Sequence, residues 1–319
     1  MTAMEERVEA PSVARELPRA SRGWALQARL APYLFVAPFV VLFCVFMLWP
    51  MVNSVWMSTW KFANPQTNQY VGAGNYKYIL TDKVFWYAVA NTVMFTILIV
   101  GLQVPASLGL AMLLNSRRVK FRGLFRFAFF SSHLVGHVFV AVIFRLILRP
   151  RTGLMAGALG SVYAPWAEIN WTENPVFGRL AIVLAVFWIN IGWGMIYFLA
   201  ALQSVDRELY EAAEVDGAGR WARFRNVTLP SIKPVVVFMV VVCTIGCFQI
   251  FELPYMLFDN GTGPGMAGMT VVMYLYMMGF EGVGDIGAAS AVGWILACLI
   301  FGVAMVQVRI ARGKAGEDG

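Results

Sequence analysis

The side chains best suited to binding chemistry lie in a charged segment that interrupts a long apolar sequence. Ten Asp, Glu, Arg and Lys residues fall between positions 206 and 233, whereas residues 180–205 and 234–251 carry none. Because charged side chains are costly in hydrocarbon, this segment must leave any bilayer that its neighbours cross. Outside the bilayer, its carboxylates and guanidinium groups are suited to ion pairs with a protein partner.

The local sequence predicts two short helices in this segment. Residues 206–216 are rich in helix formers, and Gly217 is a natural end because only glycine adopts the left-handed turn without a Cβ penalty. A second short helix is predicted over residues 221–227. Pro230 and Pro234 then mark the return to the membrane. A helix–turn–helix at the membrane surface is suited to bind a protein partner.

Two pairs of potential metal ligands are spaced by one helical turn. His133 and His137 are predicted to share one face of a single helix, where two imidazoles can bind a metal ion or carry a proton. The sequence offers no third ligand, so polar residues capped inside the subunit are the alternative. Cys243 and Cys247 have the same spacing but lie in an apolar run, where small packing residues are expected. We therefore predict no metal site.

The composition is that of an integral membrane protein. Of 319 residues, 59% are hydrophobic and 13% are charged, whereas soluble domains are roughly one quarter charged. The apolar runs predict an all-α, polytopic membrane protein with six transmembrane helices. The predicted spans are residues 31–52, a helix within 84–116, and residues 127–148, 180–202, 234–255 and 286–308.

The spans divide the chain into a tail at residues 1–30, a transmembrane domain at 31–308 and a tail at 309–319. The transmembrane domain includes the charged loop at residues 204–232. With six spans both tails lie on one side of the membrane, together with 18 of the 25 Lys and Arg residues. The positive-inside rule then places both termini and the loop in the cytoplasm. A basic charge spread in this way is an orientation signal, so we expect no nucleic acid as a partner.

The charged loop resembles the EAA loop of ABC-importer permeases, and most closely that of carbohydrate permeases related to the maltose system. The matching residues are Glu211-Ala212-Ala213, Asp216-Gly217-Ala218, Phe224 and Thr228-Leu229-Pro230. The resemblance covers roughly residues 32–309. It implies the type I ABC importer permease fold. It also implies translocation of a carbohydrate or related polar solute across the cytoplasmic membrane of a bacterium or archaeon.

The resemblance further implies residue roles and partners. In the family, the EAA positions form the helix that couples the permease to its ATPase, and here they are Glu211, Ala212, Ala213, Asp216, Gly217 and Ala218. The implied partners are a second permease subunit, two copies of an ABC ATPase and an extracytoplasmic solute-binding protein, with lipid around the spans. The sequence contains no G-x-x-x-x-G-K-[S/T] phosphate-binding loop. ATP and Mg²⁺ are therefore expected on the partner ATPase, and no cofactor is expected in this chain.

Other segments extend the resemblance, and one departs from it. Family elements are matched at residues 70–76, Asn91-Thr92, residues 122–126, residues 248–252 with Glu252 in place of Asp, and residues 260–265 with Thr270. The span at 127–148 has Ser131-Ser132 and Gly136-His137 where related chains tend to have Leu-Pro and Ser-Pro. This span therefore lacks the prolines that would produce the local helix kink of the family.

The solute path is expected among polar and aromatic side chains of the fourth and fifth spans. Aromatic faces stack on sugar rings, and amides form hydrogen bonds with hydroxyl groups. The candidates are Trp188, Asn190, Trp193, Tyr197, Gln249 and Tyr255, with packing as the alternative for each aromatic residue. Glu252, near the outer end of the fifth span, is a candidate gate, a pairing residue for the partner subunit, or a headgroup contact.

Two other classes of protein compete with the importer permease. A self-sufficient secondary transporter needs an ion relay or repeats with broken helices, and the sequence shows no internal repeat and few ionisable residues in its spans. A membrane enzyme needs a catalytic set, and the only cluster, Ser131, Ser132, His133 and His137, has no acidic residue beside it. We therefore predict that the chain is not an enzyme. Sugars, polyols and glycerol phosphate all remain compatible as solutes.

Overall fold

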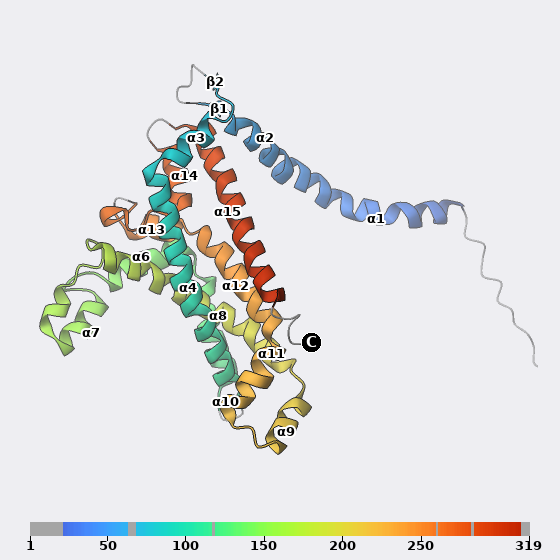
Figure 1. The fold of residues 1–319 in the computed structure, drawn as a ribbon, viewed down its shortest axis with the longest axis vertical. Helices are drawn as coiled ribbons and strands as arrows, with labels where there is room; N and C mark the ends of the chain where they lie inside the picture. The colour runs from blue at the N-terminus through green and yellow to red at the C-terminus, as the bar shows by residue number, and fades with distance from the viewer. Residues whose placement is uncertain (1–21, 63–67, 117–118, 260, 282–283, 314–319) are drawn as a thin grey trace, which may run out of the picture. The chain divides into compact units, whose positions relative to one another are not determined.

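The computed structural model describes residues 22–62, 68–116, 119–259, 261–281 and 284–313 (Figure 1). The described part is almost entirely helical, with one antiparallel pair of two-residue strands. Its elements are α1 (Arg22–Phe43), η1 (Cys44–Leu48), α2 (Trp49–Ser58), β1 (Trp60–Lys61), β2 (Gln69–Tyr70), α3 (Gly74–Thr81), α4 (Lys83–Asn115), α5 (Arg122–Ser131), η2 (Ser132–Leu134), α6 (His137–Ile147), α7 (Leu154–Val162), η3 (Ala164–Glu168), α8 (Pro175–Gln203), α9 (Arg207–Val215), α10 (Arg220–Arg223), η4 (Phe224–Thr228), α11 (Leu229–Ser231), α12 (Lys233–Phe248), α13 (Glu252–Leu257), η5 (Pro264–Met266), α14 (Val271–Phe280) and α15 (Ile286–Gly313).

The chain divides into two compact units, residues 1–53 and 54–319, and each is described by itself. The described part of the first unit is a long apolar helix that begins at Arg22, before the start predicted at residue 31. One turn of π-helix, η1, interrupts it. Residues 1–21 and 314–319 of the predicted tails lie outside the described residues, whereas residues 22–30 belong to α1 and residues 309–313 belong to α15.

Within the described residues, four single helices are long and apolar enough to cross a membrane. They are Leu30–Ser58, Lys83–Asn115, Pro175–Gln203 and Ile286–Ala311. Each overlaps one of the predicted spans, namely the first, second, fourth and sixth. Two bent helix pairs, at residues 122–147 and 220–248, pass the same test when each pair is taken as one span. The prediction of an all-α chain with six spans is confirmed on this basis.

The third predicted span is wrong as a single helix. The helical segments on either side of residues 135 and 136 meet at an angle of 101°. The Ser132 hydroxyl donates to the backbone oxygens of Phe129 and Trp188, at 2.9 and 3.0 Å, and so ties the end of the first segment to α8. Val135 and Gly136 then adopt extended backbone. The bend therefore forms without proline.

The fifth predicted span is also wrong as a continuous helix over residues 234–255. Helix α12 ends at Phe248, and α13 begins at Glu252 after a non-helical stretch. The Thr270 hydroxyl donates to the Ile250 backbone oxygen at 2.7 Å, which satisfies a carbonyl group that the broken helix leaves free. The predicted spans end at residue 255 and resume at residue 286, so the prediction does not include the apolar helix α14, which lies between them.

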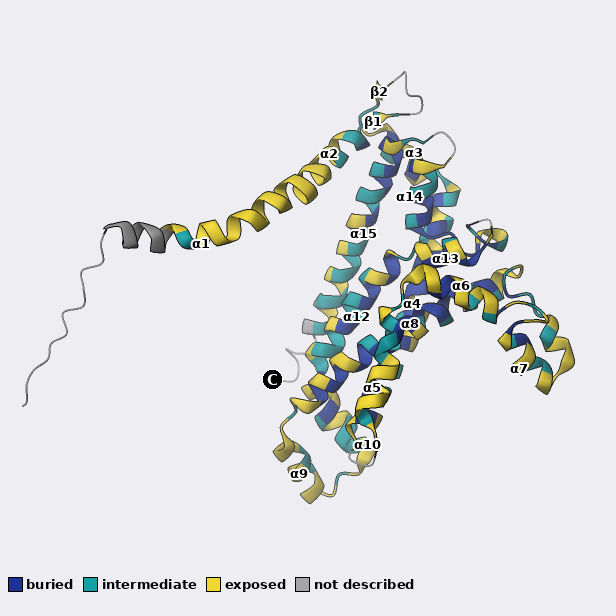
Figure 2. Cartoon of the chain, turned by 180° about the vertical axis from the view of Figure 1, so that it is seen from behind, coloured by how far each residue is buried: buried dark blue, intermediate teal, exposed yellow. Residues whose placement is uncertain are grey.

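The core of the second unit is built where α4 packs against α8, and both helices carry many buried residues. Buried residues, in dark blue, gather around these two helices in Figure 2. The Ser107 hydroxyl of α4 donates to the Ile191 backbone oxygen of α8 at 3.0 Å. Gly192 lets α5 approach even more closely, because a Cβ atom placed there would lie 1.9 Å from the Phe129 oxygen. This packing fixes the face of α8 that carries the candidate side chains Asn190 and Trp193.

The Asn-Thr pair of α4 holds the loop that precedes α14. The Asn91 amide donates to the backbone oxygens of Met266 and Met269, at 3.0 and 3.1 Å. The Thr92 hydroxyl oxygen accepts from the Val271 N–H at 3.1 Å. All these groups are buried or partly buried, where unsatisfied backbone oxygens are costly. The pair therefore positions η5 and α14 against α4.

Candidate functional site

The charged loop folds locally as the sequence predicts. The Asp206 carboxylate caps α9 by accepting the Glu208 N–H at 3.0 Å. At the other end, Gly217 has a φ of 75°. Its N–H donates to the Glu214 oxygen at 3.1 Å, and the Ala218 N–H donates to the Ala213 oxygen at 2.9 Å. This pair of bonds is a Schellman motif, which confirms the predicted helix end at Gly217.

Side chains tie α9 to the helical turns that follow it. The Arg223 guanidinium donates to the Glu214 carboxylate at 3.0 Å. The Tyr210 hydroxyl lies 3.0 Å from the hydroxyl oxygen of Thr228, which is buried at the turn of π-helix η4. The second predicted helix is longer than expected, because helical turns continue through α10, η4 and α11. The loop is therefore an ordered helix–turn–helix.

The loop presents its functional candidates to the surface. Glu211, Ala212, Asp216 and Gly217 are exposed, while Ala213 and Ala218 are half-buried. The Glu211 carboxylate accepts from Arg207 at 2.8 Å across one exposed turn, a kind of pair that contributes little to stability. Apolar side chains stand exposed around these positions, at Leu209, Val215 and Trp221.

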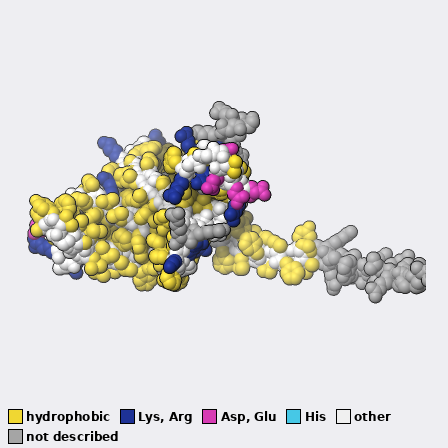
Figure 3. All heavy atoms as spheres, turned by 90° about the horizontal axis from the view of Figure 1, so that it is seen from below, with side chains coloured by type: hydrophobic (Ala, Val, Ile, Leu, Met, Phe, Trp, Pro, Cys, Tyr) yellow, Lys and Arg dark blue, Asp and Glu magenta, His cyan; other side chains and the backbone are white. Residues whose placement is uncertain are grey.

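Figure 3 shows the second unit from the end that carries α9 and α10 in Figure 1. Acidic and basic side chains stand close together there, beside a broad hydrophobic surface. A carboxylate next to small and apolar side chains can dock in a cleft that supplies a basic group.

A second candidate site is a cavity of about 710 Å³ bordered by α4, α8, α12 and α13. The histidine-bearing segments η2 and α6 form another part of its wall. Its polar lining residues are Gln103, His133, His137, Asn190, Gln249 and Glu252, with Trp193 as an aromatic face. Gln103 is 3% exposed and donates to the Cys243 sulfur at 3.4 Å. Few polar groups in a mostly apolar wall are typical of a small-molecule site.

The structure brings together three of the six side chains predicted for the solute path. Asn190, Trp193 and Gln249 line the cavity. Tyr197 lies behind Trp193, with ring centroids 4.8 Å apart. Trp188 instead lines a separate cavity of about 260 Å³. Tyr255 is not a lining residue, although it stacks on Phe251, which is one.

The two histidines do not share one helix face, contrary to the prediction, because the 101° bend separates them. They nevertheless meet at the same cavity. The His133 ring stacks on Trp193 at 6.0 Å, and its buried Nδ1 has no hydrogen-bond partner among the described residues. The Nδ1 atom of His137 lies 3.5 Å from a carboxylate oxygen of Glu252.

The lining also includes Gln103, which the sequence analysis missed. A polar residue within the apolar run of α4 was the available signal. Among the residues that the structure describes, no three His, Cys, Asp or Glu side chains form a group that can hold a metal ion.

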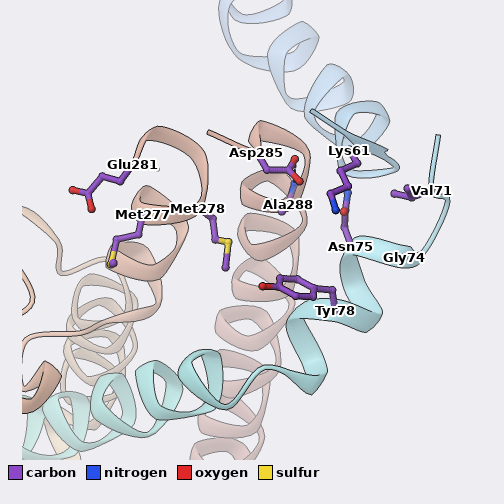
Figure 4. Close-up of a pocket in the computed structure, with 10 residues that line it drawn as sticks. All are labelled: Lys61, Val71, Gly74, Asn75, Tyr78, Met277, Met278, Glu281, Asp285 and Ala288. Atoms are coloured by element: carbon purple, nitrogen blue, oxygen red, sulfur yellow. Dashed lines mark hydrogen bonds between the residues drawn. The ribbon is translucent and has the colours of Figure 1, made fainter. Parts of the chain in front are cut away.

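Another cavity, of about 510 Å³, lies between α3, α14 and α15 (Figure 4). None of the predicted site residues lines it. The Asp285 carboxylate caps α15 through the Gly287 and Ala288 N–H groups. The Asn75 amide donates to the backbone oxygens of Ser58 and Trp60, both at 2.8 Å. These polar groups hold backbone in place, so this cavity is a weaker candidate for solute binding.

The fold and the two sites define a class of protein. In the second unit, helices α4, α6, α8 and α12 border a cavity with polar lining residues, and a charged helix–turn–helix projects from the same unit. Such an arrangement is typical of the membrane-embedded subunit of a transport system, with one surface for the solute and another for a protein partner.

The chain belongs to the family described as binding-protein-dependent transport system inner membrane component, whose model matches residues 103–315. It is therefore a transport permease of the inner membrane and not an enzyme. It is 36% identical over 310 residues to the arabinooligosaccharides transport system permease protein AraP of Bacillus subtilis (strain 168), covering 96% of both chains. It is 31% identical over 287 residues to the sn-glycerol-3-phosphate transport system permease protein UgpA of Yersinia pestis bv. Antiqua (strain Antiqua), covering 89% of this chain and 94% of that one.

A solved structure shares the fold. It is the crystal structure of a bacterial ABC transporter involved in the import of the acidic polysaccharide alginate. The TM-score is 0.78 at 24% identity, and the match covers 92% of this chain and 99% of that one. The expectation of an ABC importer permease fold is confirmed.

Proposed function

We propose that this chain is one permease subunit of an ABC importer for a carbohydrate, and that α9 and its turn couple it to a separate ATPase. The observation that carries the coupling role is the exposed helix closed by a Schellman motif at Gly217. A rigid, exposed helix can pass movement of a partner to the spans on either side of it. In this role Glu211 pairs with a basic group of the ATPase, and Ala212 permits close contact.

The assembly contains a second permease subunit, two copies of the ATPase and an extracytoplasmic solute-binding protein. The family description supports a binding protein. Because this sequence has no phosphate-binding loop of the G-x-x-x-x-G-K-[S/T] type, ATP and Mg²⁺ bind to the ATPase. Both termini and the charged loop face the cytoplasm, as the distribution of Lys and Arg indicates.

A carbohydrate is the favoured solute because the relative named for arabinooligosaccharides is 36% identical over almost the whole chain, against 31% for the relative named for glycerol phosphate. Asn190, Trp193 and Gln249 line the path, where an aromatic face and two amides suit a sugar. Glycerol phosphate or a polyol is the second candidate. A self-sufficient secondary transporter is the third, and the exposed charged loop argues against it.

Purification of the tagged chain from its native membrane in mild detergent, with mass spectrometry of what co-purifies, tests the proposal. We expect an ATPase with a phosphate-binding loop and a second permease. We expect Gly217→Arg and Glu211→Lys to lose the ATPase and ATP-driven uptake while this chain still inserts in the membrane. Recovery of this chain alone, active in transport after reconstitution, would favour the secondary transporter instead.

A further inference from the structure

The solute cavity lacks basic side chains of the kind that bind anions. Among its described lining residues there is no Lys or Arg, and Glu252 is the only carboxylate. Two basic residues of neighbouring helices have other partners. Arg145 pairs with Asp259, and Arg179 donates to the Tyr87 hydroxyl at 2.8 Å. The cavity therefore has no arginine or lysine to offer to a phosphate or carboxylate group.

The two histidines do not supply the missing positive charge. The Nδ1 atom of His137 is 3.5 Å from the Glu252 carboxylate, so this imidazole already has an acidic partner. His133 packs against Trp193 with an interplanar angle of 25°. An anionic solute would lie near the Glu252 carboxylate, with no Lys or Arg in the described lining to offset the repulsion.

The same wall suits an uncharged solute with many hydroxyl groups. Asn190 donates one N–H to the Val186 oxygen at 2.9 Å, and an amide has further hydrogen-bonding sites. Gln249 is an exposed amide in the lining. His133 also lines the cavity, next to Trp193, and an imidazole can offer a ring nitrogen to a hydroxyl group.

We propose that the cavity of this chain selects uncharged, polyhydroxylated solutes and disfavours anionic ones. His133 is a polar contact next to the ring of Trp193, and Glu252 is the charge that acts against anions. This inference rests on the proposed function, because it requires the cavity to lie on the transport path. It narrows that function by setting the glycerol phosphate candidate aside.

Equilibrium binding to the assembled importer in lipid nanodiscs, without binding protein or nucleotide, tests this selectivity. The probes are radiolabelled arabinotriose and arabinotrionate, the same trisaccharide oxidised to a carboxylate at its reducing end. We expect the wild type to bind the neutral probe about tenfold more tightly. Glu252→Gln should reduce this affinity ratio severalfold by strengthening arabinotrionate binding. Glu252→Asp, which keeps the carboxylate, should restore the wild-type ratio of the two affinities. His133→Phe should weaken arabinotriose binding by about fivefold through loss of one hydrogen bond.

Glu168→Gln is the matched control, because Glu168 is an exposed carboxylate paired with Arg151 and outside the cavity lining. The ratio of the affinities of the Glu168→Gln variant for the two probes should equal that of the wild type. Any of three results would overturn the inference. They are equal affinity for the two probes, a ratio of the two affinities that Glu252→Gln leaves unchanged, and no saturable binding of arabinotriose. ATP-driven uptake of arabinotriose with the binding protein present is measured alongside. Absence of that uptake counts against the carbohydrate importer itself, whereas uptake without discrimination between the probes counts against the inference alone.

Discussion

Two glycines of this chain are required for different physical reasons. Gly217 needs a left-handed backbone, with a φ of 75°, although a Cβ atom there would meet nothing within 4 Å. Gly192 lies in helix α8 and needs space, because its Cβ position falls 1.9 Å from the Phe129 oxygen. The sequence indicates the first requirement, since Gly217 follows a run of helix formers. The second depends on where α5 packs, which no local pattern shows.

Gly217→Ala is expected to lower ATP-driven uptake about tenfold or more. A non-glycine residue in the left-handed region costs about 1–2 kcal/mol, which favours loop conformations that displace Glu211 and its neighbours. The matched control is Gly219→Ala, because Gly219 has an ordinary φ of −66° and equally open surroundings. Reconstituted proteoliposomes give the uptake rates. Equal rates for the two variants would contradict the coupling geometry.

Gly192→Ala is expected to destabilise the permease by about 1–3 kcal/mol or more, because the added methyl group overpacks the contact of α8 with α5. Thermal unfolding of the detergent-solubilised complex measures the loss. Gly101→Ala in α4 is the control, since its Cβ position is open and alanine favours helix. If both variants unfold at the wild-type temperature, the close approach of α5 to α8 is wrong.

At the scale of elements, the breaks in the third and fifth predicted spans have one cause. The third and fifth spans read as continuous apolar runs, and no proline marks a break at residues 135–136 or 249–251. Both breaks coincide with hydrogen bonds from distant residues. Ser132 donates to Trp188, and Thr270 donates to Ile250. Hydrophobic periodicity reports burial along one segment, so it carries no signal for a bond made across the fold.

The ion pair between Glu214 and Arg223 joins α9 to α10, and its charges can be exchanged as a test. Glu214→Arg or Arg223→Glu alone is expected to lower the recovery of the ATPase with the purified chain by up to about fivefold, the equivalent of about 1 kcal/mol. The double exchange should recover most of that loss. Lower recovery for each single variant with no rescue by the double variant would mean that these residues contact the partner directly.

At the scale of the whole molecule, the distribution of basic residues predicts orientation. In a variant without the four native cysteines, Thr81→Cys should react with a membrane-impermeant maleimide added outside spheroplasts. Gly219→Cys should react only after the membrane is permeabilised. Residues 61–83 carry 3 of the 25 Lys and Arg residues, whereas the segment around Gly219 carries 5 between positions 206 and 233. Reversed labelling would place the charged loop outside the cell and exclude coupling to a cytoplasmic ATPase.

The sequence by itself determined the helical class, the six apolar runs, and the helix and turn of the charged loop. Each follows from neighbouring residues: apolar length sets a span, and glycine permits the left-handed turn at Gly217. Only the tertiary structure decided which side chains share the cavity between α4, α8, α12 and α13. It bends the chain between His133 and His137, brings both to Asn190 and Glu252, and leaves Trp188 and Tyr255 outside. Those contacts join residues far apart in the chain, so packing and long-range hydrogen bonds determine them.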